Sequence, residues 1–180
     1  LIMDIRTADI SDLSDIALLH AKSWQENYHV VLTDEYLAQT VFEERTEVWR
    51  QRLTAPSANQ LVLIAEVNNE FSGFICLYGG NHSDYGSIID NLHVQPCMKG
   101  RGIGTQLIAH AAKWVSTHFP DEAIYLEVLA VNEKAIGYYK SLGGVNIDTA
   151  FWHTPCNTTA KEFLLQWPTP QALVNICKSL

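Results

Sequence analysis

The sequence predicts a single α/β domain in which helices cover both faces of a mixed, mostly antiparallel sheet. Two observations carry this prediction. Pairs of strand-like segments joined by short turns indicate antiparallel hairpins, and a strand–helix–strand order in the second half indicates one parallel crossover. The 180 residues are 47% hydrophobic and 18% charged, which suffices for one core. We expect residues 1–168 to form the domain and residues 169–180 a C-terminal tail that can form a short helix.

The first third of the chain predicts one strand followed by helices. Residues 3–7 alternate in polarity and predict a short strand. Apolar residues recur every three or four positions over residues 11–24, as in an amphipathic helix. Thr33 precedes two acidic residues, a pattern typical of a helix start, and residues 43–53 continue as helix until Pro56 ends it.

The middle of the chain predicts three antiparallel strands. Residues 61–67 and 71–78 predict a hairpin with a turn at 68–70, and residues 87–94 predict a third strand. The glycines and polar residues between 79 and 84 predict a loop. The remaining segments predict, in order, an amphipathic helix over 103–118, a strand over 123–131, a helix over 133–142 capped by Asn132, and strands over 145–152 and 161–167.

The charge balance argues against nucleic-acid binding. Twelve Lys and Arg side chains stand against twenty Asp and Glu, a net charge of −8, whereas a nonspecific nucleic-acid binder needs a basic face. No apolar run approaches the length of a membrane span, and the four cysteines form no CxxC pair. The seven histidines show no HExxH spacing. We therefore expect a cytoplasmic protein with reduced thiols that binds no metal, nucleic acid or membrane.

The most informative segment joins the strand at 87–94 to the helix at 103–118. Its three alternating glycines lie in a run of candidate ligand-binding residues: Lys99, Gly100, Arg101, Gly102, Ile103, Gly104 and Thr105. Glycine lets a ligand approach main-chain N–H groups, and a helix leaves its first N–H groups unpaired, so the segment predicts a cradle for a diphosphate. The spacing matches neither the P-loop nor the GxGxxG dinucleotide pattern, which disfavours a nicotinamide-dependent oxidoreductase.

This segment resembles motif A of the GCN5-related N-acetyltransferases (GNAT), Q/R-x-x-G-x-G/A, with Lys99 in the first position. Residues 132–144 resemble a second family pattern, N-x-x-A-x-x-x-Y-x-x-x-G-F/Y, with Gly144 in place of the aromatic residue. Phe151 is expected to compensate for the missing ring. The resemblance covers residues 3–167, and the two motifs occur at the family's separation and in its order of elements.

The resemblance implies that acetyl-CoA is the acyl donor. Its pyrophosphate is expected on the amides of the glycine segment, and its pantetheine arm beside the exposed backbone of the strand at 87–94. In the family this strand and the next parallel strand splay apart, and the thioester lies between them. The expected donor contacts outside the glycine segment are Leu92, His93, Val94, Asn132, Ala135 and Tyr139.

Tyr139 is the expected general acid. It lies four residues after the alanine of the motif, so both share one helix face, and its phenol is protonated at neutral pH. This position matches the tyrosine acid of the family, whereas Tyr138 is expected to pack. The base stays open among Asp90, which is the first candidate, Glu127 and His93.

The acceptor is expected between the first helices and the loops of the sheet, where carboxylates and aromatic rings suit an ammonium group. The candidates are Trp24, Glu26, Tyr28, Asp84 and Tyr85. These inferences predict an N-acetyltransferase that transfers the acetyl group directly, in a ternary complex, to a primary amine of a small molecule or peptide. A catalytically weak acyl-CoA-binding sensor of the same fold is the alternative. A homodimer is compatible with the sequence.

Overall fold

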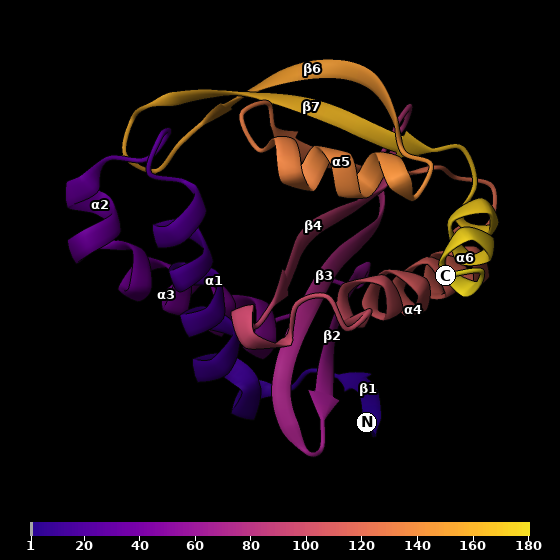
Figure 1. The fold of residues 1–180 in the computed structure, drawn as a ribbon, viewed down its shortest axis with the longest axis horizontal. Helices are drawn as coiled ribbons and strands as arrows, with labels where there is room; N and C mark the ends of the chain where they lie inside the picture. The colour runs from indigo at the N-terminus through magenta and orange to yellow at the C-terminus, as the bar shows by residue number, and fades with distance from the viewer. Residues whose placement is uncertain (1) are drawn as a thin grey trace.

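A computed structural model describes residues 2–180 and contains one seven-stranded sheet within that range (Figure 1). The strand order is β1-β2-β3-β4-β5-β7-β6, and β4 with β5 is the parallel pair among antiparallel neighbours, which confirms the predicted sheet. The strands are β1 (Met3–Thr7), β2 (Gln60–Val67), β3 (Glu70–His82), β4 (Gly86–Val94), β5 (Ile124–Leu129), β6 (Val145–His153) and β7 (Thr159–Trp167).

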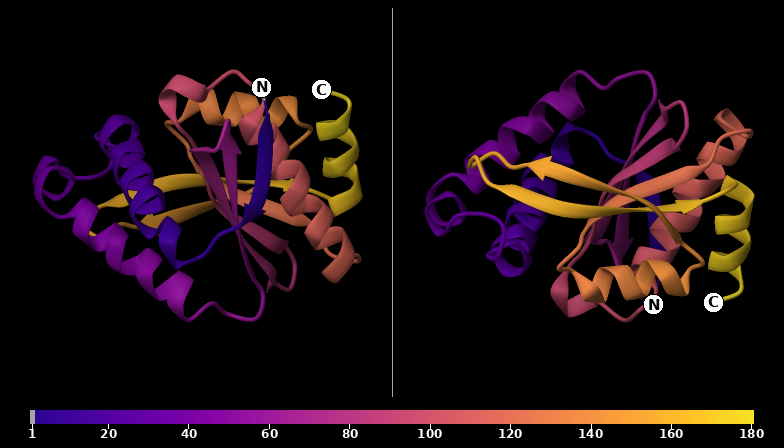
Figure 2. Two further views of the ribbon diagram at one scale, coloured as in Figure 1. Left: turned by 90° about the horizontal axis from the view of Figure 1, so that it is seen from below. Right: turned by 90° about the horizontal axis from the view of Figure 1, so that it is seen from above.

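Helices cover both faces of the sheet, as the two further views show (Figure 2). The helices are α1 (Leu13–Asn27), α2 (Asp34–Gln39), α3 (Val41–Thr54), α4 (Ile103–His118), α5 (Glu133–Ser141) and α6 (Pro170–Lys178). Helices α1 and α3 lie against one face, and α4 with α6 against the other. No helix within residues 2–180 is both long and apolar enough to cross a membrane.

Successive side chains of the central strands point to opposite faces of the sheet, so the core is divided between the two helical layers. Leu63 of β2 and Ile75 of β3 pack against the α4 side, whereas Ile64 and Phe74, one position along, pack against α1 and α3. Leu173 of α6 is fully buried in the α4 core, so the last helix packs onto the sheet layer beside α4.

Side-chain caps fix two of the predicted helix starts. Thr33 Oγ1 accepts a hydrogen bond from the Tyr36 amide at 3.3 Å, at the start of α2. Asn132 Oδ1 accepts one from the Ala135 amide at 3.2 Å, at the start of α5. Each cap satisfies an N–H group that the first turn of a helix leaves unpaired, which sets where these helices begin.

The loop predicted between 79 and 84 is wrong over residues 79–82, because β3 continues to His82. Gly79 is a strand residue for a packing reason. A Cβ at this position would lie 2.1 Å from the Phe119 ring, so the ring occupies the space of the missing side chain. The turn itself is confined to residues 83–85.

The expected compensation for Gly144 comes from a different residue. Phe151 is 63% exposed and does not fill the core. Trp167 is 1% exposed, and a Cβ added to Gly144 would lie only 2.9 Å from its ring. The Nε1–H of Trp167 donates to the Leu142 carbonyl at 2.9 Å. A tryptophan from β7 thus supplies the aromatic packing, and its bulk requires glycine at 144.

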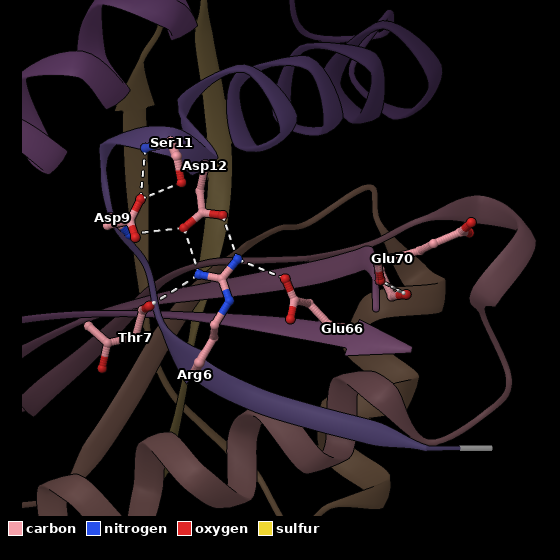
Figure 3. A network of polar contacts seen from close by, with 8 residues as sticks. Arg6, Thr7, Asp9, Ser11, Asp12, Glu66 and Glu70 are labelled. Atoms are coloured by element: carbon pink, nitrogen blue, oxygen red, sulfur yellow. Dashed lines mark hydrogen bonds and ion pairs between the residues drawn. The ribbon is translucent and has the colours of Figure 1, made fainter. Parts of the chain in front are cut away.

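A polar network holds the edge strand β1 to its neighbours (Figure 3). Arg6 donates to both carboxylate oxygens of Asp12, at 2.8 and 2.9 Å, and to Glu66 Oε1 of β2 at 2.8 Å. The Asp12 carboxylate also accepts the Asp9 amide at 2.9 Å, within the turn that leads into α1. One guanidinium therefore ties β1, β2 and the start of α1 together.

Candidate active site

A cavity opens where the parallel strands separate. β4 and β5 pair only through Ser87 with Ile124 and Ile88 with Tyr125, and their C-terminal halves enclose a volume of about 770 Å³. Ligands of α/β sheets gather at such carboxyl ends of parallel strands. The predicted site residues that line the cavity are Trp24, Tyr28, Asp90, Leu92, His93, Val94, Lys99, Gly100, Gly102, Ile103, Gly104, Thr105, Glu127, Asn132, Ala135 and Tyr139.

The glycine segment forms an open cradle at the start of α4. Gly100 and Gly102 have φ values of 78° and 79°, a left-handed conformation that favours glycine, and a Cβ on either would meet no atom within 4 Å. The first N–H to find a helical partner is that of Gln106, which donates to the Gly102 carbonyl at 3.0 Å. The amides of residues 103–105 therefore remain free for an anion, at the positive end of the helix dipole.

Tyr138, which the sequence predicts only to pack, contributes to this cradle. Its hydroxyl lies 2.8 Å from Thr105 Oγ1, on the first turn of α4. Tyr138 follows Ala135 by three residues, so it shares the inward face of α5 with Tyr139. That spacing is the signal that could have identified it. The contact links α5 to the segment that suits a diphosphate.

Tyr139 reaches the same cavity from the next position of α5. Its ring lies edge-on to Trp167, with centroids 6.4 Å apart, and next to Tyr138 at 5.3 Å. Burial raises the pKa of Tyr139 above its ordinary value, with smaller contributions from Tyr138 and Tyr28. Its phenol is therefore protonated at neutral pH and is available as a proton donor.

Asp90 is the extra residue of a β-bulge in β4. Ile89 and Asn91 pair with consecutive residues of β3, which leaves Asp90 without a partner. In a regular strand Asp90 and Asn91 would point to opposite faces, but here both bind Arg52 of α3. Arg52 Nη2 lies 3.0 Å from Asp90 Oδ2, and Nη1 donates to Asn91 Oδ1 at 2.8 Å. The first candidate base is thus held in an ion pair.

Glu127 of β5 has a second carboxyl group beside it, that of Glu162 on β7. Burial raises the pKa of Glu162 to about 7, and the Glu127 and Asp90 carboxylates add to this shift. Burial also raises the pKa of Glu127. The sequence does not identify Glu162 as a site residue, because alternation along a strand does not reveal which strand lies next to it. Within residues 2–180, no three His, Cys, Asp or Glu side chains are grouped to hold a metal ion.

His93, the third candidate base, is buried on β4. Its Nδ1 lies 3.1 Å from Ser23 Oγ of α1, and its ring centroid is 4.9 Å from that of His20. Burial lowers the pKa of His93 to about 4, and the charge of Lys99 adds to the effect. His93 is therefore neutral at physiological pH and a weak proton acceptor.

Aromatic rings line the side of the cavity next to α1. Trp24 stacks on Tyr28 with centroids 5.5 Å apart, and Trp152 of β6 meets Trp24 edge-on at 5.4 Å. The Arg45 guanidinium lies 4.5 Å from the centre of the Trp24 ring. Burial, and then the charge of Glu162, raise the pKa of Tyr28 to about 12. Aromatic faces next to carboxylates form a surface that suits an ammonium group.

Four predicted site residues do not line this cavity. Glu26 lies two residues after Trp24 and two residues before Tyr28, both of which line the cavity, so it lies on another side of α1. Asp84 and Tyr85 lie in the turn before β4, at the opposite end of that strand, where Tyr85 Oη donates to Asp148 at 2.5 Å. Arg101 lines a second hollow, of about 440 Å³, between α4, β1 and the C-terminus.

Comparisons with known proteins agree with this geometry. The model of the acetyltransferase (GNAT) family matches residues 21–143. The uncharacterized N-acetyltransferase YhfO of Bacillus subtilis is 31% identical over 162 residues, which are 88% of this chain and all of that protein. The crystal structure of the PaiA N-acetyltransferase of Thermoplasma acidophilum in complex with coenzyme A has a TM-score of 0.72 at 19% identity, covering 92% and 98% of the two chains. The YncA protein of Salmonella typhimurium, solved with its cofactor acetyl-CoA, has a TM-score of 0.66 at 17% identity and covers 93% and 94%.

Proposed function

Because the chain belongs to the GNAT family of acetyltransferases, with acetyl-CoA as the acyl donor, we propose that it acetylates a primary amine of a small molecule or peptide by direct transfer in a ternary complex. One observation carries the proposal. The open glycine cradle, the protonated Tyr139 phenol and a set of carboxylates all line one continuous cavity.

The cradle at the start of α4 suits the diphosphate of the donor. Free amides at residues 103–105 and the open space over Gly100 and Gly102 admit an anion without a steric clash. Beyond its two pairs with β5, the cavity side of β4 offers backbone groups to the donor's amide-containing arm at Leu92 to Val94. When bound, acetyl-CoA supplies an acetyl group activated as a thioester.

The side chains around the cavity supply what amine acetylation needs. Tyr139 holds a proton that it can give to the departing sulfur, because burial disfavours its phenolate. Tyr28 and Trp152 offer aromatic surface to an incoming ammonium group in the cavity that the carboxylates of β5 and β7 also line, whereas the Trp24 ring already packs against Tyr28 and the Arg45 guanidinium. Donor and acceptor therefore meet from opposite sides of the gap between β4 and β5.

A donor-binding and turnover experiment tests this function. We expect acetyl-CoA to raise the thermal midpoint of the full chain, and thiol release from acetyl-CoA to depend on a primary amine drawn from polyamines, amino acids, aminoglycosides and peptides. Tyr139→Phe should lower kcat by about 10²-fold or more while leaving acetyl-CoA affinity nearly unchanged, as expected for loss of a general acid. Donor binding without turnover on any amine would instead support the sensor.

A further inference from the structure

Two glutamates from neighbouring strands stand together in the cavity. In the β5–β7 ladder Glu162 pairs with Leu129 and Glu127 with Leu164, so the two glutamates lie diagonally on one face of the sheet. Both line the cavity, and each carboxyl group shifts the pKa of the other. We propose that Glu127 and Glu162 act as one unit that takes the proton from the acceptor ammonium group. This inference rests on the proposed function.

The other candidate bases are already engaged. Asp90 is ion-paired with Arg52 at 3.0 Å, and the same guanidinium is held by Asn91 at 2.8 Å. The Nδ1 atom of His93 faces Ser23 Oγ at 3.1 Å, and burial of the ring disfavours the imidazolium. Neither group can accept a proton without breaking an existing contact or charging a buried ring.

The surroundings of the pair set the pH at which it gains or loses a proton. Burial and the charges of Glu127 and Asp90 raise the pKa of Glu162 to about 7. Four ionisable groups surround the pair: Asp90 of β4 with its partner Arg52 of α3, Tyr28 at the end of α1, and Tyr125 on β5. Both tyrosines stay protonated, so near neutrality the pair alternates between one bound proton and none.

The proton balance of the reaction follows from this arrangement. The doubly ionised pair takes one proton from the ammonium group, which frees the nitrogen lone pair. A C–N bond forms to the acetyl carbonyl carbon, the C–S bond breaks, and Tyr139 gives its proton to sulfur. The second proton that nitrogen loses restores the Tyr139 phenol, and the pair releases its own proton to solvent. One proton is released in each turnover.

A titration that needs no acceptor tests the pair directly. In the full chain labelled with ¹³C at the glutamate carboxyl carbons, we expect one carboxyl resonance to titrate near pH 7. Glu162→Gln should remove that resonance, and Glu127→Gln should move its midpoint toward the ordinary value of about 4.3. Glu70→Gln, an exposed change at the start of β3, should leave it in place and is the matched control.

Kinetics then test the role of the pair in proton transfer. With the primary amine that gives the fastest thiol release, kcat should rise with pH through a midpoint near 7. Glu162→Gln should lower the plateau by about 10²-fold, within the range for general base catalysis, and abolish that midpoint. Glu70→Gln should change neither the plateau nor the midpoint.

The outcomes separate the two proposals. If no glutamate titrates near neutrality, or if Glu162→Gln leaves the kcat profile of an active enzyme unchanged, the paired base is wrong while acetyl transfer stands. If the resonance behaves as expected but no amine is acetylated, the proposed function fails, and with it the role of the pair in catalysis.

Discussion

The guanidinium of Arg52 binds the Asp90 carboxylate at 3.0 Å across the gap between α3 and the bulge in β4. The same guanidinium lies 4.8 Å from the centre of the Trp49 ring, so Arg52 packs against this ring in addition to its ion pair with Asp90. This contact fixes a residue that the sequence alone favours as a base. It also connects the helical layer to the strand that the donor approaches.

We predict that Arg52→Met destabilises the protein. The substitution keeps most of the apolar packing but leaves Asp90 and Asn91 without their donor, and hydrogen bonds to charged groups contribute about 1.5–3 kcal/mol. Urea unfolding should show a loss of that size in the free energy of unfolding. Arg50→Met on the same helix removes only an exposed pair with Glu47 and should change it by less than about 0.5 kcal/mol. Equal losses in the two variants would contradict the assigned role of Arg52.

A methyl group at Gly102 should impair donor binding more than folding. Its φ of 79° makes alanine there cost about 1–2 kcal/mol in stability, and the added Cβ points into open space that the donor's phosphates would need. Isothermal titration with coenzyme A should show an affinity at least about tenfold lower, equivalent to 1.4 kcal/mol.

Gly137→Ala is the matched control for this substitution. Gly137 lies inside α5, and a Cβ there also meets no atom within 4 Å. Alanine in a helix interior is favoured over glycine by about 0.8–1 kcal/mol, so this variant should unfold at a higher temperature and bind coenzyme A as before. Unchanged coenzyme A affinity in Gly102→Ala would show that the cradle does not hold the donor.

Tyr138 and Tyr139 should separate affinity from turnover. Tyr138→Phe removes the hydroxyl that lies 2.8 Å from Thr105, and a hydrogen bond of about 0.5–1.5 kcal/mol corresponds to a roughly two- to tenfold loss of coenzyme A affinity. Its kcat should stay close to that of the unmodified chain. Tyr139→Phe should show the reverse pattern. If Tyr138→Phe lost as much kcat as Tyr139→Phe, the assignment of the general acid to Tyr139 would be wrong.

The stability of the fold should depend on pH through Glu162. Its pKa is about 7 in the folded protein and near the ordinary value when unfolded, so the folded state binds more protons between these values. Its contribution is therefore present at acidic pH and is lost as pH rises toward 8. Glu162→Gln should gain stability relative to the unmodified chain between pH 5 and pH 8, by on the order of 1 kcal/mol. A difference that does not change with pH would argue against the raised pKa.

The features that the sequence predicts correctly are those set by local chemistry. The glycines at 100 and 102 and the cap at Asn132 act through their own backbone, so their spacing suffices to locate the cradle and the start of α5. The features it misses depend on distant partners. Gly79 looks like a turn residue until the Phe119 ring is placed against it, and Glu162 gains its neighbour only because β7, rather than β6, lies beside β5.

The bulge at Asp90 has a consequence for the rest of its strand. One extra residue in a strand reverses the face to which each later side chain points. The orientation of Leu92, His93 and Val94 relative to the cavity therefore depends on the extra residue before them. Deleting that single residue would turn each of these side chains to the other face. The strand would remain, with Leu92 and Val94 moved from the α4 side to the α1 side and His93 moved the other way.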